Sequence, residues 1–543
     1  MTKLVETKWL FERLNGPSLV IIDASPTDEY MTMHIEKAVS ASFGPEEYIS
    51  YGINTSYGGG VDLFTDPDSP LPFQDGDPEY TGRVLRSLGI NQDSTVVVYD
   101  NGASFHATRV FWTLSLHGLK NVHILNGGIE KWEMEGRPVT TRIPVVQEGD
   151  FAPRSCEPSP VVDTDYVLEN LANPDVTLVD SNLASWYHGD FLAYSRRGHI
   201  PYAVNIPYPS YFSLDRTWKS KDKLHRMFAL LGVVPEKEII VYCGGNPAGS
   251  SLYFTLRHVL GYPRVKFYLK SLIGWLSDPR QLPVHTYANE HMLRDAEWVR
   301  WFAGERIQYL VRDTRVRAVD VRSREDYTKG HIPYAVSLPV DELIETCNDL
   351  KDWEEVFGQN GISNHTELVL YDHRYNLTSS LLLWILEYFG HKKVSVLHGG
   401  FSGWTEKGYT VSTQPPILEK PRHKFDVAIA PTSYTITPDS EKIYLGAPED
   451  RDPEREDQIR MPILATAGGI ERFTDPDTGL KSAGELFAIY DGAGLSKPHD
   501  IICHGHTLKE AAFHYFLLRL LGFPRIRVAP GAIGPIGQEE KKP

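Results

Sequence analysis

Cys243 stands where a short apolar run ends and a glycine-rich loop begins. The loop consists of Gly244, Gly245, Asn246, Pro247, Ala248 and Gly249, and a pattern with helical spacing follows it. Glycines let several backbone N–H groups turn inward, and these donors favour an anion together with the positive end of a helix. If that anion is the sulfur of Cys243, its pKa falls and a thiolate forms near neutral pH. We therefore expect Cys243 to be a nucleophile toward sulfur, with the resulting persulfide held by the same donors.

Cys503 occupies a similar setting, after an apolar pair and before another helical pattern. Its loop contains His504 and His506, which would lower the pKa of the thiol when they are protonated. Two alternatives stay open at Cys503: a second persulfide site and an inactive remnant. We predict no metal site, because three ligands crowded on one tight loop rarely suffice. Cys156 and Cys347 lack the strand-to-helix setting, and we predict no role for them.

Both candidate cysteines belong to an internal repeat. The apolar runs are 96–99, 239–242, 368–371 and 501–502. The residues that directly follow the four runs are Asp100, Cys243, Asp372 and Cys503. A glycine follows 18 residues later in three repeats and 19 residues later in the fourth, at Gly118, Gly261, Gly390 and Gly522. Chance does not keep such spacing over four copies, so we predict four homologous units of about 130 residues each.

Each repeat indicates an α/β domain. Continuous β-branched runs are typical of strands buried on both faces, which favours a mainly parallel sheet flanked by helices. The glycine after each helical pattern is a normal C-terminal stop. Proline-rich spacers at 137–160 and 411–437 join the first repeat to the second and the third to the fourth, and 290–306 is predicted to be an amphipathic helix. The predicted domains are 1–140, 160–283, 300–412 and 436–543, arranged as two inactive/active pairs.

Composition excludes several other classes of function. The formal net charge is −16, which disfavours an electrostatically driven nucleic-acid binder. No run of 18 apolar residues exists, so we predict no membrane span. The first residues mix charges where a signal peptide needs an apolar core, and the four cysteines lie far apart. A reducing, cytoplasmic location is therefore the expectation.

The repeats resemble rhodanese domains. The first repeat has Ile22-Asp23-Ala24, Tyr30 and His34-Ile35. The second has Val179-Asp180 and Gly198-His199-Ile200-Pro201, and the third has Val319-Asp320-Val321-Arg322, Tyr327 and Gly330-His331-Ile332-Pro333. The fourth repeat lacks the Gly-His-Ile-Pro segment and the tryptophan that follows Gly127 and Gly399 in the first and third.

The resemblance implies a sulfurtransferase that needs no cofactor. Asp100 and Asp372 stand where the family's cysteine would be, and a carboxylate cannot form a persulfide, so these repeats look inactive. Cys243 matches the persulfide position, and by the family pattern the loop amides from Gly244 to Gly249 bind the sulfur. Arg197, beside Arg196, would supply charge for an anionic donor.

The loop after Cys243 departs from both well-known subfamilies. Thiosulfate-specific loops resemble Cys-Arg-Lys-Gly, and here Gly244 and Gly245 replace both cations. Mercaptopyruvate-specific loops resemble Cys-Gly-Ser-Gly, and Gly245 removes their serine. The sequence therefore leaves the donor open.

Sulfur transfer is the favoured interpretation. Sulfane sulfur would move from an anionic donor such as thiosulfate or 3-mercaptopyruvate to Cys243, and from there to a thiol, cyanide or a protein acceptor. One alternative is a non-catalytic scaffold of rhodanese-like docking modules. A weaker one is an arsenate or phosphate enzyme at Cys503, although such relatives need an arginine six residues after the cysteine. That position is Lys509 here, and Gly249 after Cys243.

Overall fold

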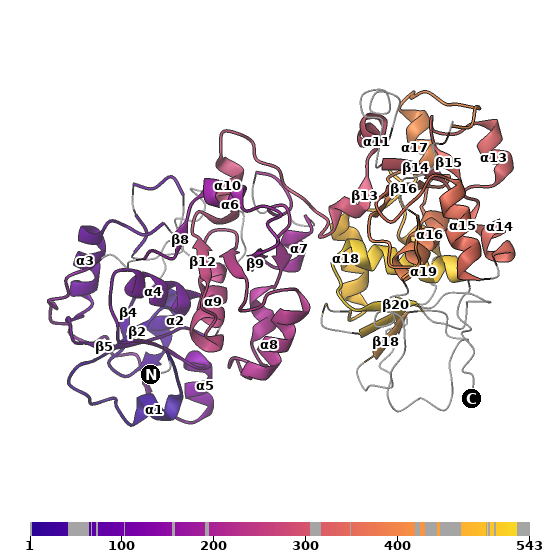
Figure 1. Cartoon of the computed structure of the whole chain (residues 1–543). Coiled ribbons are helices and arrows are strands. Elements are labelled where there is room, and N and C mark those ends of the chain that lie inside the picture. Colours follow the sequence, from indigo (N-terminus) through magenta and orange to yellow (C-terminus); the bar gives the residue numbers. More distant parts are fainter. Residues whose placement is uncertain are drawn as a thin grey trace, which may run out of the picture. The chain divides into compact units, whose positions relative to one another are not determined.

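The chain forms two compact units, Met1–Thr286 and Tyr287–Pro543, seen in a computed structural model (Figure 1). The structure describes residues 3–41 and 64–528, apart from 67, 72–73, 103, 155–157, 190–194, 304–315, 348, 417, 419–423, 429–441, 446–468, 496, 498–499 and 504–506. In this described part, no helix combines the length and apolar character needed to cross a bilayer.

The first unit contains two five-stranded parallel sheets with the same topology. In spatial order the first sheet has β1 (Leu4–Val5), β6 (Val122–Leu125), β5 (Thr95–Tyr99), β2 (Leu19–Asp23) and β4 (Val39–Ser40). The second has β8 (Val161–Val162), β12 (Val265–Tyr268), β11 (Glu238–Tyr242), β9 (Val176–Asp180) and β10 (Val204–Asn205). A small antiparallel pair joins β3 (His34–Ile35) to β7 (Val139–Thr140). The predicted apolar runs form β5 and β11, the central strands, where both faces are buried.

Helices cover the sheets of the first unit. They are α1 (Thr7–Phe11), α2 (Thr27–Thr32), α3 (Pro78–Ser87), α4 (Phe105–Leu116), α5 (Gly128–Met134), α6 (Thr164–Glu169), α7 (Ala184–Tyr187), α8 (Lys221–Leu230), α9 (Pro247–Phe254), which continues as a π-helix over Thr255–Leu260, and α10 (Ser271–Ser277). The helices α4 and α9, which follow the central strands, pack on each other with Phe111 and Phe254 in edge contact at 4.8 Å. One apolar core runs through both sheets.

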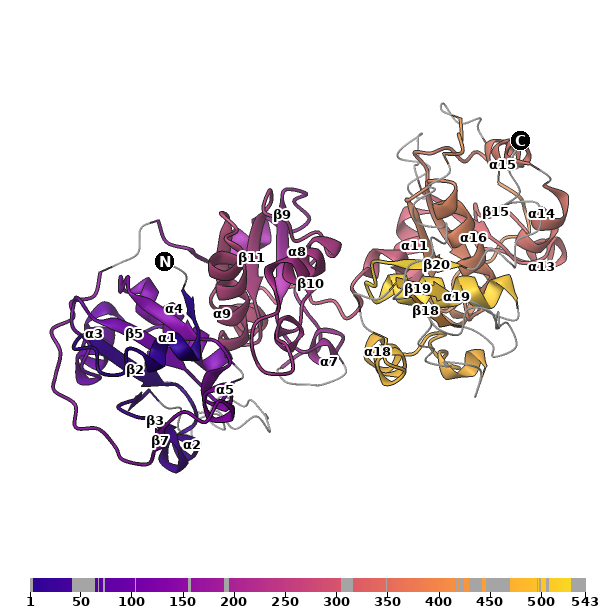
Figure 2. The same cartoon turned by 90° about the horizontal axis from the view of Figure 1, so that it is seen from below.

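The second unit follows the same plan. Its five-stranded parallel sheet has β13 (Leu293–Arg294), β17 (Val394–Leu397), β16 (Glu367–Tyr371), β14 (Val316–Asp320) and β15 (Val336–Ser337) in spatial order. A three-stranded parallel sheet has β18 (Lys442–Leu445), β19 (Asp500–Cys503) and β20 (Ile526–Val528). The helices are α11 (Ala296–Phe302), α13 (Arg324–Lys329), α14 (Val340–Thr346), α15 (Leu350–Gln359), α16 (Leu377–Tyr388), α17 (Gly400–Glu406), α18 (Ala483–Gly492) and α19 (Leu508–Leu520). α16 packs on α19 as α4 packs on α9 (Figure 2). The predicted α/β class with parallel sheets flanked by helices is confirmed, whereas the four domain boundaries stay a prediction.

The glycines that follow the four central helices confirm the predicted helix ends. Gly118, Gly261, Gly390 and Gly522 have φ values of 92°, 78°, 83° and 81°. This left-handed conformation closes a helix C-terminus and is easy only for glycine, because a Cβ would crowd the following carbonyl oxygen.

The amphipathic helix predicted over 290–306 is wrong in its extent. The segment begins as a 3₁₀ turn, Glu290–Met292, and continues as β13 along the edge of the sheet, where Leu293 pairs with Val396. Only then does α11 begin, because the side chain of Asp295 accepts the backbone N–H of Trp298 at 2.7 Å and caps it. Strand pairing and this cap override the helical spacing of the apolar residues.

The motif residues that carry the resemblance hold the ends of the central strands. In each of the first three repeats a tyrosine ring stacks on a histidine ring: Tyr30 on His34, Tyr187 on His199 and Tyr327 on His331, with centroids 4.1, 3.5 and 3.8 Å apart. The isoleucine after each histidine donates its N–H to the hydroxyl of the last strand residue: Ile35 to Tyr99, Ile200 to Tyr242 and Ile332 to Tyr371. Those tyrosines directly precede Asp100, Cys243 and Asp372. The motif therefore fixes the point from which each reactive loop starts.

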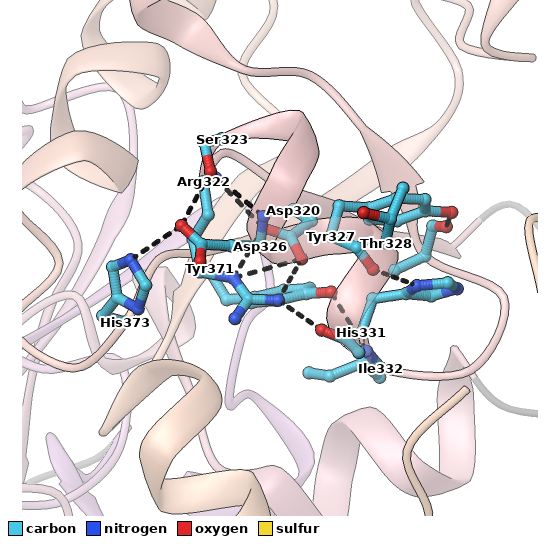
Figure 3. Close-up of polar contacts among 12 residues, drawn as sticks. Asp320, Arg322, Ser323, Asp326, Tyr327, Thr328, His331, Ile332, Tyr371 and His373 are labelled. Atoms are coloured by element: carbon cyan, nitrogen blue, oxygen red, sulfur yellow. Dashed lines mark hydrogen bonds and ion pairs between the residues drawn. The ribbon is translucent and has the colours of Figure 1, made fainter. Parts of the chain in front are cut away.

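The third repeat adds a buried ion pair to this arrangement (Figure 3). Arg322 donates to Asp320 Oδ2 at 2.6 Å and to the carbonyl oxygen of Gly330 at 2.8 Å. Its guanidinium lies 3.9 Å from the centroid of the Phe401 ring. Because both charges are almost fully buried, losing one partner would leave the other uncompensated.

We predict that Arg322→Met destabilises the region around β14 by about 3–5 kcal/mol, since Asp320 loses its partner. Hydrogen exchange of peptides covering residues 316–332 measures the effect. Arg324→Met is the matched control, because the ion pair of Arg324 with Glu342 is exposed and such pairs contribute about 1 kcal/mol or less. Equal loss of protection in the two variants would contradict the assignment.

Candidate active site

Cys243 lies at the carboxyl end of β11, between the first turns of two helices. The N–H of Leu272 donates to the carbonyl oxygen of Cys243 at 2.9 Å, and that of Ile273 donates to Gly244 O at 3.0 Å. These bonds attach the loop to α10, while α9 begins at Pro247. The thiol side chain is 2% exposed. The loop is thus held from both sides, with its sulfur turned inward.

Backbone N–H groups of the loop surround the sulfur. The N–H of Asn246 donates to Cys243 Sγ at 3.1 Å, and the N–H groups of Gly245 and Gly249 also bond to the sulfur. Asn246 has a φ of 99°, which turns its amide inward at an energetic cost. Pro247 carries no N–H and donates nothing here, but it suits the first position of α9. We call the N–H groups of Gly245, Asn246 and Gly249 the amide cradle of Cys243.

The pKa of Cys243 is raised to about 11, so the expectation of a lowered pKa is wrong for the resting protein. Burial is the largest cause, because it removes water from the thiolate. The three amides oppose it, and the nearby carboxylate of Asp180 adds to it. The resting site therefore holds a neutral thiol inside a cradle that suits an anion.

The equivalent loop of the first repeat already holds an anion. The carboxylate of Asp100 accepts the N–H groups of Gly102 at 3.0 Å and Ser104 at 2.8 Å on one oxygen, and that of Ala107 at 3.0 Å on the other. Burial raises the pKa of Asp100, and these three bonds oppose the shift. The Asp100 side chain thus accepts loop N–H groups in the first repeat, as the sulfur of Cys243 does in the second.

The third repeat repeats this geometry. Asp372 accepts the N–H of Asn376 at 3.0 Å on Oδ1, and those of Thr378 at 2.9 Å and Ser379 at 3.3 Å on Oδ2. Burial raises the pKa of Asp372 as well, and its three hydrogen bonds oppose the shift. Two loops thus direct three backbone N–H groups at a carboxyl group of their own chain, an arrangement that suits an anion.

Ser271 is a residue at the site that the sequence reasoning missed. Its hydroxyl accepts the N–H of Cys243 at 3.4 Å and donates to Tyr268 O at 3.2 Å. Ser271 has a φ of 53°, close to the 57° and 56° of the equivalent Gly128 and Gly400. A non-glycine residue in this left-handed conformation stores strain, and aligning the repeats at Gly-Gly would have revealed it.

Two further hydroxyls face the loop from other elements. Ser181, which follows β9, donates to the carbonyl oxygen of Ala248 at 2.9 Å. Tyr211 lies 3.3 Å from the Ser181 hydroxyl, is fully buried and interacts electrostatically with Cys243. Burial raises the pKa of Tyr211, so this phenol stays neutral beside the sulfur. No local motif identified these residues.

The first repeat contributes to the surroundings of the loop. Thr108 Oγ1 on α4 lies 3.3 Å from Ser250 Oγ on α9, and the ring of Phe105 lies 5.4 Å from that of Tyr208. The starts of the two helices therefore adjoin each other within the first unit.

Arg197, expected to attract the donor, is exposed and donates to the carbonyl oxygen of Gly189 at 3.3 Å. Arg196 donates to Leu282 O at 2.8 Å. Neither contact involves the loop after Cys243, so the role of Arg197 stays a prediction.

Cys503 lies at the end of β19, the central strand of its sheet, and is fully buried in an apolar core. Burial raises the pKa of Cys503. Residues 504–506 lie outside the described residues, so the predicted roles of His504 and His506 stay untested.

Comparisons with known proteins place these features in a wider context. The sulfur carrier protein TtuD of Thermus thermophilus is 31% identical over 287 residues, which are 50% of this chain and 93% of that protein. The 3-mercaptopyruvate sulfurtransferase of Escherichia coli is 30% identical over 50% of this chain and 95% of its own length. The thiosulfate sulfurtransferase of Azotobacter vinelandii is 28% identical over 51% of this chain and 94% of its own length.

Among solved structures, the 3-mercaptopyruvate sulfotransferase SseA from Escherichia coli is 30% identical and aligns over 50% of this chain and 99% of its own, with a TM-score of 0.43. The family described as Rhodanese-like domain matches residues 6–135, 163–278 and 305–407. These three segments cover more than half of the sequence, and the chain belongs to the rhodanese-like domain family.

Proposed function

We propose that the protein is a sulfurtransferase that moves sulfane sulfur from a small anionic donor through a persulfide on Cys243. The observation that carries the proposal is the amide cradle of Cys243, which faces a sulfur. The equivalent backbone N–H groups of the first and third repeats face a carboxyl group. The relatives named thiosulfate and 3-mercaptopyruvate sulfurtransferase support the same chemistry.

The reaction has two steps. The thiol of Cys243 loses its proton to solvent or to the donor, and the thiolate attacks the outer sulfur of thiosulfate or the single sulfur of 3-mercaptopyruvate. The new S–S bond forms as the donor's bond to that sulfur breaks, and the leaving group takes the electron pair, as sulfite from thiosulfate or as pyruvate from 3-mercaptopyruvate after protonation. An acceptor thiolate or cyanide then attacks the outer sulfur and releases Cys243 as a thiolate.

The cradle acts on the charge that develops during this cycle. The thiol is neutral at rest, so the hydrogen bonds from the cradle N–H groups become strongest when a thiolate or persulfide anion forms. They are fixed by the bonds to α10 and by the start of α9, and they need no rearrangement when the charge appears. The loop offers no side-chain cation between Gly244 and Gly249, and we assign donor attraction to Arg197.

The first and third repeats do no sulfur chemistry in this proposal. In these repeats the loop N–H groups already bind the side chains of Asp100 and Asp372. The first repeat instead contacts the surroundings of the Cys243 loop through Phe105 and Thr108. We retain the four-domain arrangement in two inactive/active pairs as part of the proposal. The packing of α4 on α9 and of α16 on α19 supports it.

We retain Cys503 as a second, slower nucleophile, because it is the last residue of a central parallel strand, close to the position of Cys243 directly after β11. Phosphate or arsenate chemistry there is less favoured. Lys509, in the position where an arginine would bind the anion, forms an ion pair with Asp341 at 2.7 Å.

The first prediction concerns Cys243 itself. Cys243→Ser should lower sulfur transfer from thiosulfate or 3-mercaptopyruvate by about 10⁴-fold, because serine forms no persulfide. Intact mass after exposure to each donor should show the loss of one bound sulfur atom. Cys347→Ser removes another buried cysteine and should leave both readouts unchanged. Full turnover in Cys243→Ser, or no sulfur gain in the wild type with any donor, would favour the scaffold alternative.

A second prediction follows from the raised pKa of Cys243, which is about 11. Because the thiolate is the reactive form, alkylation of Cys243 by iodoacetamide should accelerate about tenfold per pH unit between pH 7 and pH 10. Peptide mass spectrometry after quenching measures the rate at this residue. A rate independent of pH over this range would show that the thiolate already predominates.

A third prediction separates the two cysteines. Wild-type protein should gain two sulfur atoms from an excess of donor, a fast one on Cys243 and a slow one on Cys503. Cys503→Ser should abolish the slow phase and leave the fast phase within about twofold, because the two sites belong to different compact units. A single sulfur gain in the wild type would show that the fourth repeat is inactive.

A further inference from the structure

The first unit contains a cavity far from the loop of Cys243. It is a half-open cavity of about 500 Å³ between α4 and the helical segment that runs from α9 to Leu260. Trp112 and Tyr253 form an aromatic wall, and Arg257, Arg264 and Lys266 supply positive charge. We call this space the distal cavity.

The distal cavity lies at the opposite edge of the sheet from the sulfur. Glu238, the first residue of β11, lines the cavity, whereas Cys243 follows the last residue of that strand. At about 3.3 Å per residue, the two ends are roughly 17 Å apart. The cavity therefore does not belong to the sulfur-transfer site, which uses the carboxyl edge.

The aromatic wall is held in place by its own contacts. The rings of Trp112 and Tyr253 meet edge to face at 4.8 Å, and Trp112 meets Phe267 in the same way at 4.9 Å. The indole N–H of Trp112 donates to Asp75 at 3.1 Å. Trp112 is almost fully buried, so it supports Tyr253, whose half-buried ring presents the surface that suits a flat apolar body.

The charge around the cavity is opposite in sign to that of the chain. Arg257, Arg264 and Lys266 face a single carboxylate, Glu238, which accepts the hydroxyl of Tyr166. Arg264 is exposed and Lys266 is half-buried. The chain carries a formal net charge of −16, so this concentration of cations is a local exception.

The third cation is fixed, and the adjacent histidine adds no charge. Arg257 donates to the carbonyl oxygens of Tyr262 at 3.0 Å and Pro263 at 3.3 Å. Burial lowers the pKa of His258 to about 4, with Lys3 and Arg257 adding to the shift, so its ring stays neutral near pH 7. The imidazole meets the Phe111 ring at 5.1 Å and extends the apolar wall.

We propose that the distal cavity binds a small organic anion with a flat aromatic body. The ring would pack against Trp112 and Tyr253, and the anionic group would lie toward Arg264 and Lys266. A purely inorganic anion lacks the part that fits the wall, and a neutral aromatic compound lacks the part that fits the cations.

Calorimetric titration of the full chain with naphthalene-2-sulfonate tests the proposal. We expect saturable binding of one molecule per chain, and unchanged binding to Cys243→Ser, since the cavity is separate from the sulfur. Naphthalene-2-sulfonamide, the neutral analogue, and inorganic sulfate should each bind at least about tenfold more weakly. Absence of saturable binding, or equal binding of either comparison compound, would overturn the proposal.

Paired variants locate the probe. Arg264→Ala with Lys266→Ala should weaken naphthalene-2-sulfonate binding at least about tenfold, because both cations are removed. Lys223→Ala with Arg226→Ala removes the same charge from exposed positions of α8 and should leave binding unchanged. Tyr253→Leu, chosen because this ring is only half-buried, should weaken binding without unfolding the protein, as circular dichroism would verify. Equal affinity in the first pair and the wild type would overturn the assignment.

Discussion

Backbone N–H groups that converge on one side chain at the end of a central parallel strand are the interaction on which the proposed chemistry depends. The strand, the tight turn and the following helix create this convergence, and the identity of the first loop residue decides what fills it. Asp100 and Asp372 supply their own carboxylates. Cys243 supplies a sulfur, which in the proposed reaction accepts a second sulfur atom from the donor and passes it on. One position therefore separates a closed anion site from a reactive one.

The state of the sulfur reflects a competition between burial and these donors. At Cys243 three amides oppose the desolvation of the thiolate, and burial still prevails, so the charge is not present at rest. At Cys503 burial likewise raises the pKa, and residues 504–506, which follow it, lie outside the described part of the chain. The balance at Cys243 explains how a site can be poised for an anion while the resting thiol stays neutral, because the donors act most strongly once the charge appears.

The most recognisable sequence motif is structural, and the groups that face the sulfur are main-chain atoms. His199 and Ile200 hold the end of β11 through Tyr187 and Tyr242, and the equivalent residues do the same in two other repeats. The same contacts occur before Asp100, Cys243 and Asp372 alike. A motif of this kind therefore identifies the family, whereas the proposed division into active and inactive repeats depends on the residue after the strand.

The features that could be predicted from the sequence are those that depend on local physics. β-branched runs became central parallel strands, and glycines ended the helices. The other features depend on contacts between distant parts of the chain. The raised pKa of Cys243 comes from packing by distant elements, and the predicted helix at 290–306 yielded to pairing with β17. Ser271 and the distal cavity combine residues far apart in the chain. Dihedral preferences and hydrophobic patterns act over a few residues, whereas burial and charge at a site are sums over neighbours that only folding brings together.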